Sequence, residues 1–271
     1  MSSILTDLSA PALAAAVRAN LFAFFLCGEA APVMEFERRS GFARWYLPHP
    51  LPLFHGALST RDALPGDAGD VDETLAYFRS KDAGAVCWWL DDGVDPAGWT
   101  PLLESRGFAA AEGPPGMAVD LASLPDHLTL PPGAEIHAVA GAAELRVFID
   151  LLTAVFGFPP EDSWAVYEWE RAVCVPPESA CFIATLDGVP VGTSQVLHAG
   201  GAAGVYNVAV TEACRGKGLG AALTLLPLLE ARERGYRAGV LQSSESGFPV
   251  YRRLGFEQVC RLDHHFLQIT D

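Results

Sequence analysis

The hydrophobic residues in the second half of the chain follow two different periods. Residues 135–139 alternate between apolar and polar side chains, as in a half-buried strand. Residues 141–157 have helical spacing, with apolar side chains at Leu145, Phe148, Ile149, Leu152 and Phe156. Continued to residue 269, these patterns predict the order strand, helix, helix, three strands, helix, strand, helix and two strands. Antiparallel hairpins combined with a helical crossover predict an α+β, or mixed α/β, fold.

The first half of the chain carries a similar but shorter pattern. Helices are predicted at 71–80 and 99–108, and strands at 85–90 and 116–121. The end of the second helix reads LLESRGF, which resembles VYRRLGF in the second half. This likeness is short, so a degenerate copy of the second half and an unrelated first domain are both interpretations that stay open.

A polar, proline-rich segment at 122–135 separates the two halves. Proline and polar residues between two strand patterns are typical of a domain boundary. We therefore predict a first domain at 1–125, a linker at 126–134 and a second domain at 135–271.

The composition is that of a globular protein with a strongly acidic balance. Half of the 271 residues are hydrophobic, which allows one large domain or two of ordinary size. The formal net charge of −15 argues against a nucleic-acid partner, because phosphate backbones require a basic face. An acidic exterior favours cationic ligands such as amines, although the same charge also serves solubility alone.

The apolar segment at 12–27 is long enough to suggest a signal or membrane segment. It has no basic leader, contains Arg18 and Asn20, and is too short to span a bilayer. We interpret it as a buried helix capped by Ser9, with Pro11 in its first turn. The expected location is therefore the cytoplasm, with no membrane partner.

The six cysteines show no spacing that is typical of a metal site. His264 and His265 are adjacent in a predicted strand, so their side chains point to opposite faces. The sequence therefore predicts reduced thiols and no metal.

The segment RGKGLG lies between a predicted strand and a predicted helix. Gly216, Gly218 and Gly220 leave the backbone bare, and Arg215 and Lys217 add positive charge. Unpaired N–H groups at a helix N-terminus bind anions, and glycine lets phosphate oxygens approach them. We interpret the segment as a phosphate site; a tight turn without a ligand is the alternative.

Two other phosphate motifs fit less well. A P-loop requires Ser or Thr after its lysine, whereas Gly218 follows Lys217. Gly216, Gly218 and Ala221 match the dinucleotide pattern GxGxxG/A. However, TEACR separates them from the strand, and no acidic residue ends the next strand.

The two signatures of the second half resemble those of the GNAT acetyltransferase family. VAVTEACRGKGLGAALTLL is similar to that family's Q/R-x-x-G-x-G/A motif, filled by Arg215, Gly218 and Gly220. SSESGFPVYRRLGF is similar to its Y-x-x-x-G-F segment, with Tyr251 as the tyrosine. The resemblance covers the second half and implies a GNAT fold there, and two tandem GNAT-like domains if the first half is a copy.

The resemblance implies acetyl-CoA as donor and an N-acetyltransferase that acts on a primary amine within a ternary complex. Tyr251 would give a proton to the departing CoA thiolate. The backbone of Val208 and Val210 would pair with the pantetheine arm. The implied donor-binding residues are Val208, Val210, Arg215, Gly216, Lys217, Gly218, Leu219, Gly220, Ala221 and Ser244.

The general base is not defined by the motifs. The family often uses a carboxylate in the strand before the glycine turn, and VYNVAV contains none. Candidates are Glu245, His198 and a water molecule held by Asn207, with Glu245 preferred.

The segment at 156–170 is expected to bind the acceptor, since the family's first two helices and their loop generally do so. It is aromatic and acidic: Phe158, Trp164, Tyr167 and Trp169 could form walls, and Asp162, Glu168 or Glu170 could attract an amine. The alternative is that the aromatic residues lie in a core and the carboxylates on a solvated helix face. We predict Phe158, Trp164, Tyr167 and Glu168 as the binding residues.

The first half is predicted to lack a donor site. Asp67, Asp70 and Asp72 precede or begin its first helix, where phosphate binding would require positive charge. One acetyl-CoA per chain is expected, in a monomer or homodimer. The alternative to an enzyme is a non-catalytic acyl-CoA-binding module whose first domain contacts a partner.

Overall fold

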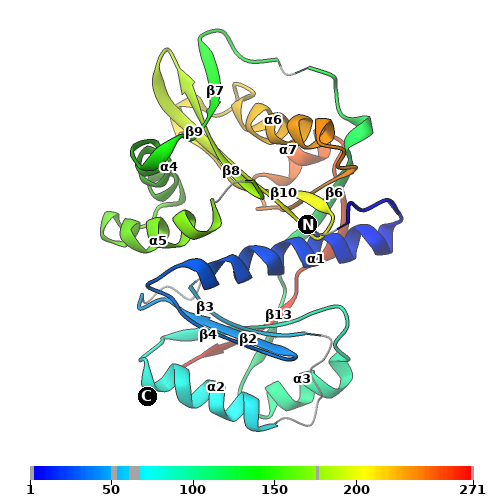
Figure 1. Ribbon diagram of the computed structural model, residues 1–271, viewed down its shortest axis with the longest axis vertical. Helices are drawn as coiled ribbons and strands as arrows, with labels where there is room; N and C mark the ends of the chain where they lie inside the picture. Colours follow the sequence, from blue (N-terminus) through cyan, green and yellow to red (C-terminus); the bar gives the residue numbers. More distant parts are fainter. Residues whose placement is uncertain (1–2, 50–53, 61–67, 128, 175–176, 270–271) are drawn as a thin grey trace. The chain divides into compact units, whose positions relative to one another are not determined.

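The chain forms two compact units in the computed structural model (Figure 1). The structure describes residues 3–49, 54–60, 68–127, 129–174 and 177–269. Unit 1 comprises Met1–Cys27 and Pro115–Cys260, and unit 2 comprises Gly28–Pro114 and Arg261–Asp271. Each unit is therefore built from two separate stretches of the chain.

The units assign several elements differently from the predicted halves. Helix α1 (Ala10–Leu26) and strand β6 (Pro115–Asp120) belong to unit 1, although both lie in the predicted first domain. Strand β13 (His264–Gln268) belongs to unit 2, although it ends the predicted second domain. The reason is strand pairing: β6 pairs with a strand of the second half, and β13 with two strands of the first. Position 128 of the predicted linker lies outside the described residues.

Unit 1 is built on a seven-stranded sheet with the order β12-β6-β11-β10-β9-β8-β7. Its other strands are β7 (Ala134–Ala138), β8 (Ser179–Leu186), β9 (Val189–Ala199), β10 (Ala202–Val210), β11 (Ala238–Gln242) and β12 (Glu257–Arg261). Its other helices are α4 (Gly141–Phe156), α5 (Ser163–Val173), α6 (Leu219–Glu233) and α7 (Phe248–Arg253). With β13, these elements have the predicted order, so that prediction is confirmed.

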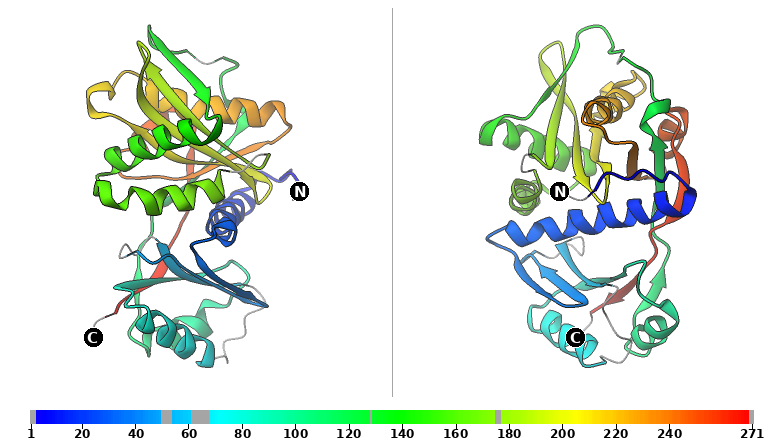
Figure 2. Two further views of the ribbon diagram at one scale, coloured as in Figure 1. Left: turned by 60° about the vertical axis from the view of Figure 1, so that its left-hand side comes forward. Right: turned by 45° about the vertical axis from the view of Figure 1, so that its right-hand side comes forward.

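Helices cover both faces of the unit 1 sheet (Figure 2). Ala203 and Val205 of β10 pack into one core cluster with Leu225 and Leu228 of α6. A Cβ on Gly204, between them, would meet Asn20 of α1 instead. Because side chains alternate along a strand, α1 and α6 lie on opposite faces.

Unit 2 contains a six-stranded sheet with the order β1-β2-β3-β4-β13-β5. Its remaining strands are β1 (Glu35–Arg39), β2 (Phe42–Tyr46), β3 (His55–Ser59), β4 (Ala85–Leu90) and β5 (Ala109–Ala111). Its helices are α2 (Ala68–Ser80) and α3 (Pro96–Glu104). The core contains fully buried Phe78, Trp88, Trp99 and Leu103. The helices and strands predicted for the first half are present.

The two sheets repeat one arrangement. In unit 1, the elements β10, α6, β11, α7 and β12 follow one another along the chain. In the sheet, β6 lies between β11 and β12. In unit 2, the elements β3, α2, β4, α3 and β5 follow one another in the same way. In the sheet, β13 lies between β4 and β5. Each half of the chain thus provides the inserted strand of the other half's sheet. This reciprocal exchange supports the interpretation of the first half as a copy.

Helix α1 is fixed to the sheet of unit 1 by its buried polar residue. Asn20 is fully buried, and its Nδ2 donates to the carbonyls of Leu197, Ala199 and Ala202. The expected buried helix is present with Ser9 at its N-cap, although the Ser9 side chain makes no capping bond. The prediction that this segment is too short to span a bilayer is wrong, because the helical stretch Ala10–Ala30 has 21 residues and, by length and composition alone, could cross a membrane.

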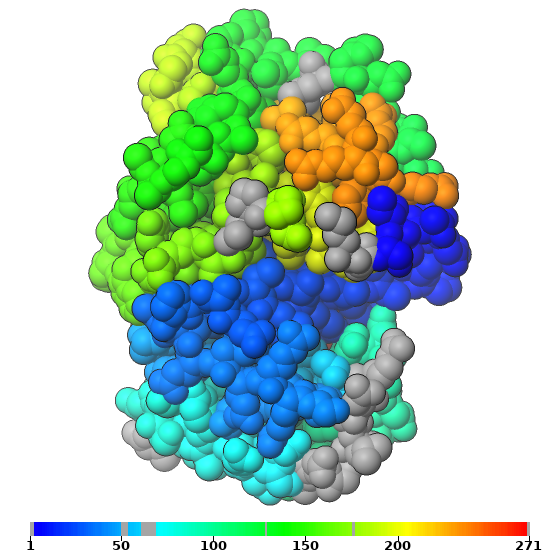
Figure 3. Space-filling view, viewed as in Figure 1, coloured from blue at the N-terminus to red at the C-terminus, as the bar shows by residue number. Residues whose placement is uncertain are grey.

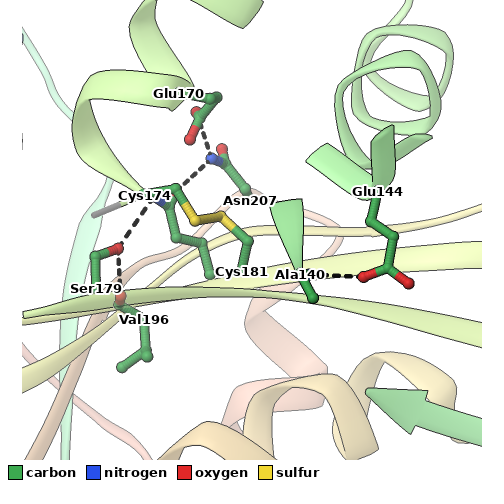
Figure 4. The surroundings of a disulfide bond; sticks show 9 residues. Ala140, Glu144, Glu170, Cys174, Ser179, Cys181, Val196 and Asn207 are labelled. Carbon is green, nitrogen blue, oxygen red and sulfur yellow. Dashed lines mark hydrogen bonds between the residues drawn. A yellow bond between two sulfur atoms is a disulfide. The ribbon is translucent and has the colours of Figure 1, made fainter. Parts of the chain in front are cut away.

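The prediction of reduced thiols is wrong for two cysteines. Cys174 follows the last turn of α5, and Cys181 lies in the middle of β8. Their Cα atoms are 6.2 Å apart, within the usual range for a disulfide, and the two sulfurs are bonded (Figure 4). Spacing along the chain could not reveal this pair, because the turn that joins α5 to β8 brings the two residues together.

We expect a thiol assay on the denatured, unreduced protein to detect four thiols per chain, since Cys27, Cys87, Cys214 and Cys260 are not part of the disulfide. After reduction, all six cysteines should react. Six thiols before reduction would contradict the disulfide.

Candidate functional site

Unit 1 contains a cavity of about 690 Å³ where β10 ends and α6 begins. Tyr251 and every predicted donor-binding residue except Lys217 line it. Phe156, at the end of α4, contributes to the wall as well. Both α4 (green) and α6 (orange) reach the surface on the side of unit 1 that Figure 3 shows.

The sheet of unit 1 opens beside this cavity. Strand β10 pairs in parallel with β11 only at Ala203, Gly204 and Val205, yet it continues to Val210. Its pairing with β9 shifts register between Tyr206 and Ala209, at a bulge. Beyond Val205, no strand among the described residues lies beside the edge of β10 that faces β11. Such an edge can bind an extended ligand as an added strand.

The glycine turn leaves open space at the N-terminus of α6. Gly218 is the N-cap residue with φ +86°, and Gly216 has φ +76°. A Cβ on either glycine would meet no atom within 4 Å. The free N–H groups of the first helical turn thus face the cavity without side chains in front of them, which suits phosphate oxygens.

Tyr251 of α7 lines the cavity with a largely buried ring, 5.9 Å from the ring of Phe256. Burial raises the pKa of its hydroxyl to about 12. The phenol therefore stays protonated at neutral pH and can donate a proton or a hydrogen bond.

The donor geometry agrees with a comparison of the sequence with protein families. Residues 177–258 match the family model described as an acetyltransferase (GNAT) domain. This match indicates a GNAT-like domain within the second half of the chain. Members of this family transfer acetyl groups from acetyl-CoA, and the match includes both the glycine turn and Tyr251.

Similar proteins extend the comparison beyond the GNAT domain. A mycothiol acetyltransferase from Thermomonospora curvata is 28% identical over 197 residues, which are 67% of this chain and 63% of that protein. The chain thus spans less than two thirds of that relative's length. A GCN5-related N-acetyltransferase from Kribbella flavida superposes with a TM-score of 0.68 at 18% identity, covering 98% of both chains.

The tandem arrangement has a counterpart among solved structures. A tandem GNAT protein from the clavulanic acid biosynthesis pathway superposes with a TM-score of 0.63 at 18% identity. The superposition covers 98% of this chain and 97% of the other. The predicted fold of two tandem GNAT-like domains is therefore confirmed.

The predicted bases of the GNAT domain lie in different surroundings. Glu245 is exposed and does not line the cavity, although its neighbours Ser244 and Ser246 do. His198 is hydrogen-bonded to the carbonyl of Glu178 and lies against the ring of Tyr236, which follows the C-terminal end of α6. The cavity is at the other end of that helix. Their catalytic roles stay predictions.

Asn207 lies at the bulge of β10 with φ +53°. Its Nδ2 donates to Glu170 Oε1 at 2.7 Å and to Gln195 Oε1 at 2.8 Å (Figure 4). Both amide hydrogens therefore have protein acceptors, and Asn207 holds a carboxylate beside the strand that lines the cavity.

Glu170 is the residue that sequence reasoning missed as a candidate base. Its side chain is 3% exposed, and burial raises its pKa to about 7. Hydrogen bonds from Asn207 and Gln195 favour the charged form and lower the pKa, but burial has the larger effect. The signal in the sequence was its position: Val166, Trp169 and Val173 are buried on the same side of α5. That spacing places residue 170 toward the sheet.

The predicted acceptor residues lie on α5 and on the loop before it. Trp164 is 41% exposed, and Phe158 contacts the ring of Phe156, which lines the cavity. Glu168 forms an ion pair with Arg171 at 2.7 Å. Tyr167 is half-buried, and none of the four predicted residues lines the cavity. Their role in acceptor binding stays a prediction.

In unit 2, the segment between β3 and α2 corresponds in element order to the glycine turn. Its residues 61–67, which include Asp67, lie outside the described residues. Asp70 is paired with Arg39 at 2.8 Å, and Asp72 with Arg106 at 2.7 Å. The arginines close to this helix therefore have carboxylate partners, which is consistent with the expected lack of a second donor site.

Proposed function

We propose that this protein transfers the acetyl group of acetyl-CoA to a primary amine by direct attack within a ternary complex. One observation carries the proposal: a single cavity combines the unpaired edge of β10, the open N-terminus of α6 and the hydroxyl-bearing ring of Tyr251. The first would bind the pantetheine arm, the second the pyrophosphate, and the third would lie near the sulfur. A simple phosphate site needs only the second.

A small molecule or peptide with a cationic amine is the proposed acceptor. The net charge of −15 attracts cations. The exposed side chain of Phe156, which lines the cavity, provides apolar surface for the rest of the acceptor. The similarity to a mycothiol acetyltransferase supports acetyl transfer to a small molecule.

In the proposed reaction, the amine nitrogen attacks the thioester carbon, so that a C–N bond forms and the C–S bond breaks. The departing thiolate takes a proton from Tyr251, which regains one from solvent. We expect Tyr251→Phe to lower kcat roughly 10- to 100-fold, because the proton donor is lost while packing against Phe256 is kept. The KM for acetyl-CoA should change less than about threefold.

Steady-state kinetics of thiol release would measure this effect. The fall in kcat should diminish with acetyl donors whose thiol leaves readily, since these need less help from an acid. An unchanged kcat for Tyr251→Phe would remove Tyr251 from the proposed mechanism.

The proposed function itself is tested by thiol release from acetyl-CoA with a panel of amines, aminoglycosides and peptides. Turnover that depends on the amine, with the acetylated product identified by mass spectrometry, supports the enzyme. Tight acetyl-CoA binding without turnover on any acceptor would favour the non-catalytic binding module, a candidate because β10 carries no carboxylate.

A further inference from the structure

Glu170 is the only buried carboxylate in the part of the chain that the structure describes. No cation forms an ion pair with it there, and its Oε2 is buried without a hydrogen-bond partner. A charged group in these surroundings is costly unless it is paired. Gln or an apolar residue would fill the same space at lower cost, so a structural role alone does not account for an acid at this position.

The surroundings of Glu170 are neutral. Asn207 from β10 and Gln195 from β9 face its carboxylate. The Cys174–Cys181 disulfide follows at the end of α5 (Figure 4). Burial and these two amides, with no nearby charge, set its affinity for protons. Both the acid and the base form are therefore accessible near neutral pH, as acid–base catalysis requires.

Glu170 does not line the donor cavity itself, but its carboxylate is held beside β10, a strand that does. Its partner Asn207 directly precedes Val208, which lines the donor cavity. The positive φ of Asn207 belongs to the bulge at which β10 leaves β11. This bulge turns the Asn207 amide toward α5, and the amide fixes one oxygen of Glu170 while the other stays free.

We propose that Glu170 accepts the proton that the amine must lose before it attacks acetyl-CoA. This inference rests on the proposed function and assigns the base to α5 in place of the exposed Glu245. An ammonium group, R–NH₃⁺, gives one proton to the Glu170 carboxylate and becomes R–NH₂. After the C–N bond forms, the nitrogen releases its second proton to solvent, which balances the proton that the CoA thiolate takes from Tyr251 and that Tyr251 regains from solvent. Glu170 then returns its proton to solvent.

The test compares Glu170→Gln, Glu245→Gln and the control Glu233→Gln. Glu233 is exposed at the C-terminal end of α6, away from the cavity. With an acceptor amine on which the wild type turns over, we expect Glu170→Gln to lower kcat/KM at pH 7 by about 100- to 1,000-fold. The other two variants should stay within about threefold of the wild type.

Three further measurements separate catalysis from a structural role. The acidic limb of the wild-type pH–rate profile should disappear in Glu170→Gln, whereas a purely structural defect would lower the rate at every pH and keep that limb. Acetyl-CoA binding and Tm should not fall, because Gln keeps the size and the acceptor for Asn207. Glu170→Asp, which keeps the acid, should retain intermediate activity with the limb present.

The outcomes distinguish this inference from the function on which it rests. Wild-type rates in Glu170→Gln, or a large loss in Glu245→Gln alone, would overturn the role of Glu170 and leave the acetyltransferase intact. A wild type without turnover on any amine would overturn the proposed function, and the role of Glu170 with it.

Discussion

Replacing Gly218 with glutamate should weaken acetyl-CoA binding at least 100-fold. Gly218 begins α6 at φ +86°, and the space in front of its Cα is empty. A glutamate there would place a carboxylate in the path of the pyrophosphate, where like charges repel. It would also cover the N–H groups that are expected to bind the phosphates. Isothermal titration calorimetry with acetyl-CoA would measure the loss.

The matched control for this substitution is Gly188→Glu. Gly188 has φ +80°, and a Cβ on it would also meet nothing within 4 Å, but it lies in the turn between β8 and β9. Both substitutions carry the same backbone cost of about 1–2 kcal/mol. Equal loss of binding in both variants would show that strain, and not occupation of the phosphate site, is the cause.

Substituting Asn20 with leucine should destabilise unit 1 by about 3–5 kcal/mol. The Asn20 amide donates to three carbonyls at the β9–β10 turn, and its Oδ1 accepts from the hydroxyl of Tyr206 at 2.6 Å. Leucine fills a similar volume but leaves these buried groups without a partner. Unfolding in urea would measure the change in the free energy of unfolding.

Thr153→Val is the control for Asn20→Leu. Thr153 is also buried, but its hydroxyl bonds only to the carbonyl of Ile149 within α4. That carbonyl belongs to the helix, so we expect a change below about 1 kcal/mol. An Asn20→Leu variant as stable as this control would mean that the amide contributes little to holding α1 on the sheet.

The donor site could be predicted from sequence because its signals are local. A positive φ at Gly216 and Gly218 favours glycine, and the Y-x-x-x-G-F segment keeps Tyr251 a fixed distance from a helix end. The helices and strands of both halves follow from short-range periodicity in the same way. Such features need no knowledge of what packs against them.

The exchange of β6 and β13 could not be predicted, because a strand's pattern does not specify its neighbour. Residues of β6 pair with β11, more than 100 positions later. Glu170 was overlooked for a related reason. Its burial depends on α5 packing on β9 and β10, and its partner Asn207 lies 37 positions away.

The central position of β13 delays completion of the unit 2 sheet until late in synthesis. The sheet of unit 2 lacks the strand between β4 and β5 until residues 264–268 have left the ribosome. Unit 1 receives β6 early, so its strands can pair as soon as β11 and β12 have been made. Because β12 ends at Arg261 and β13 begins at His264, both sheets are completed by neighbouring strands late in synthesis. Until then, the edges of β4 and β5 that pair with β13 in the folded protein are unpaired, and a chaperone could bind them.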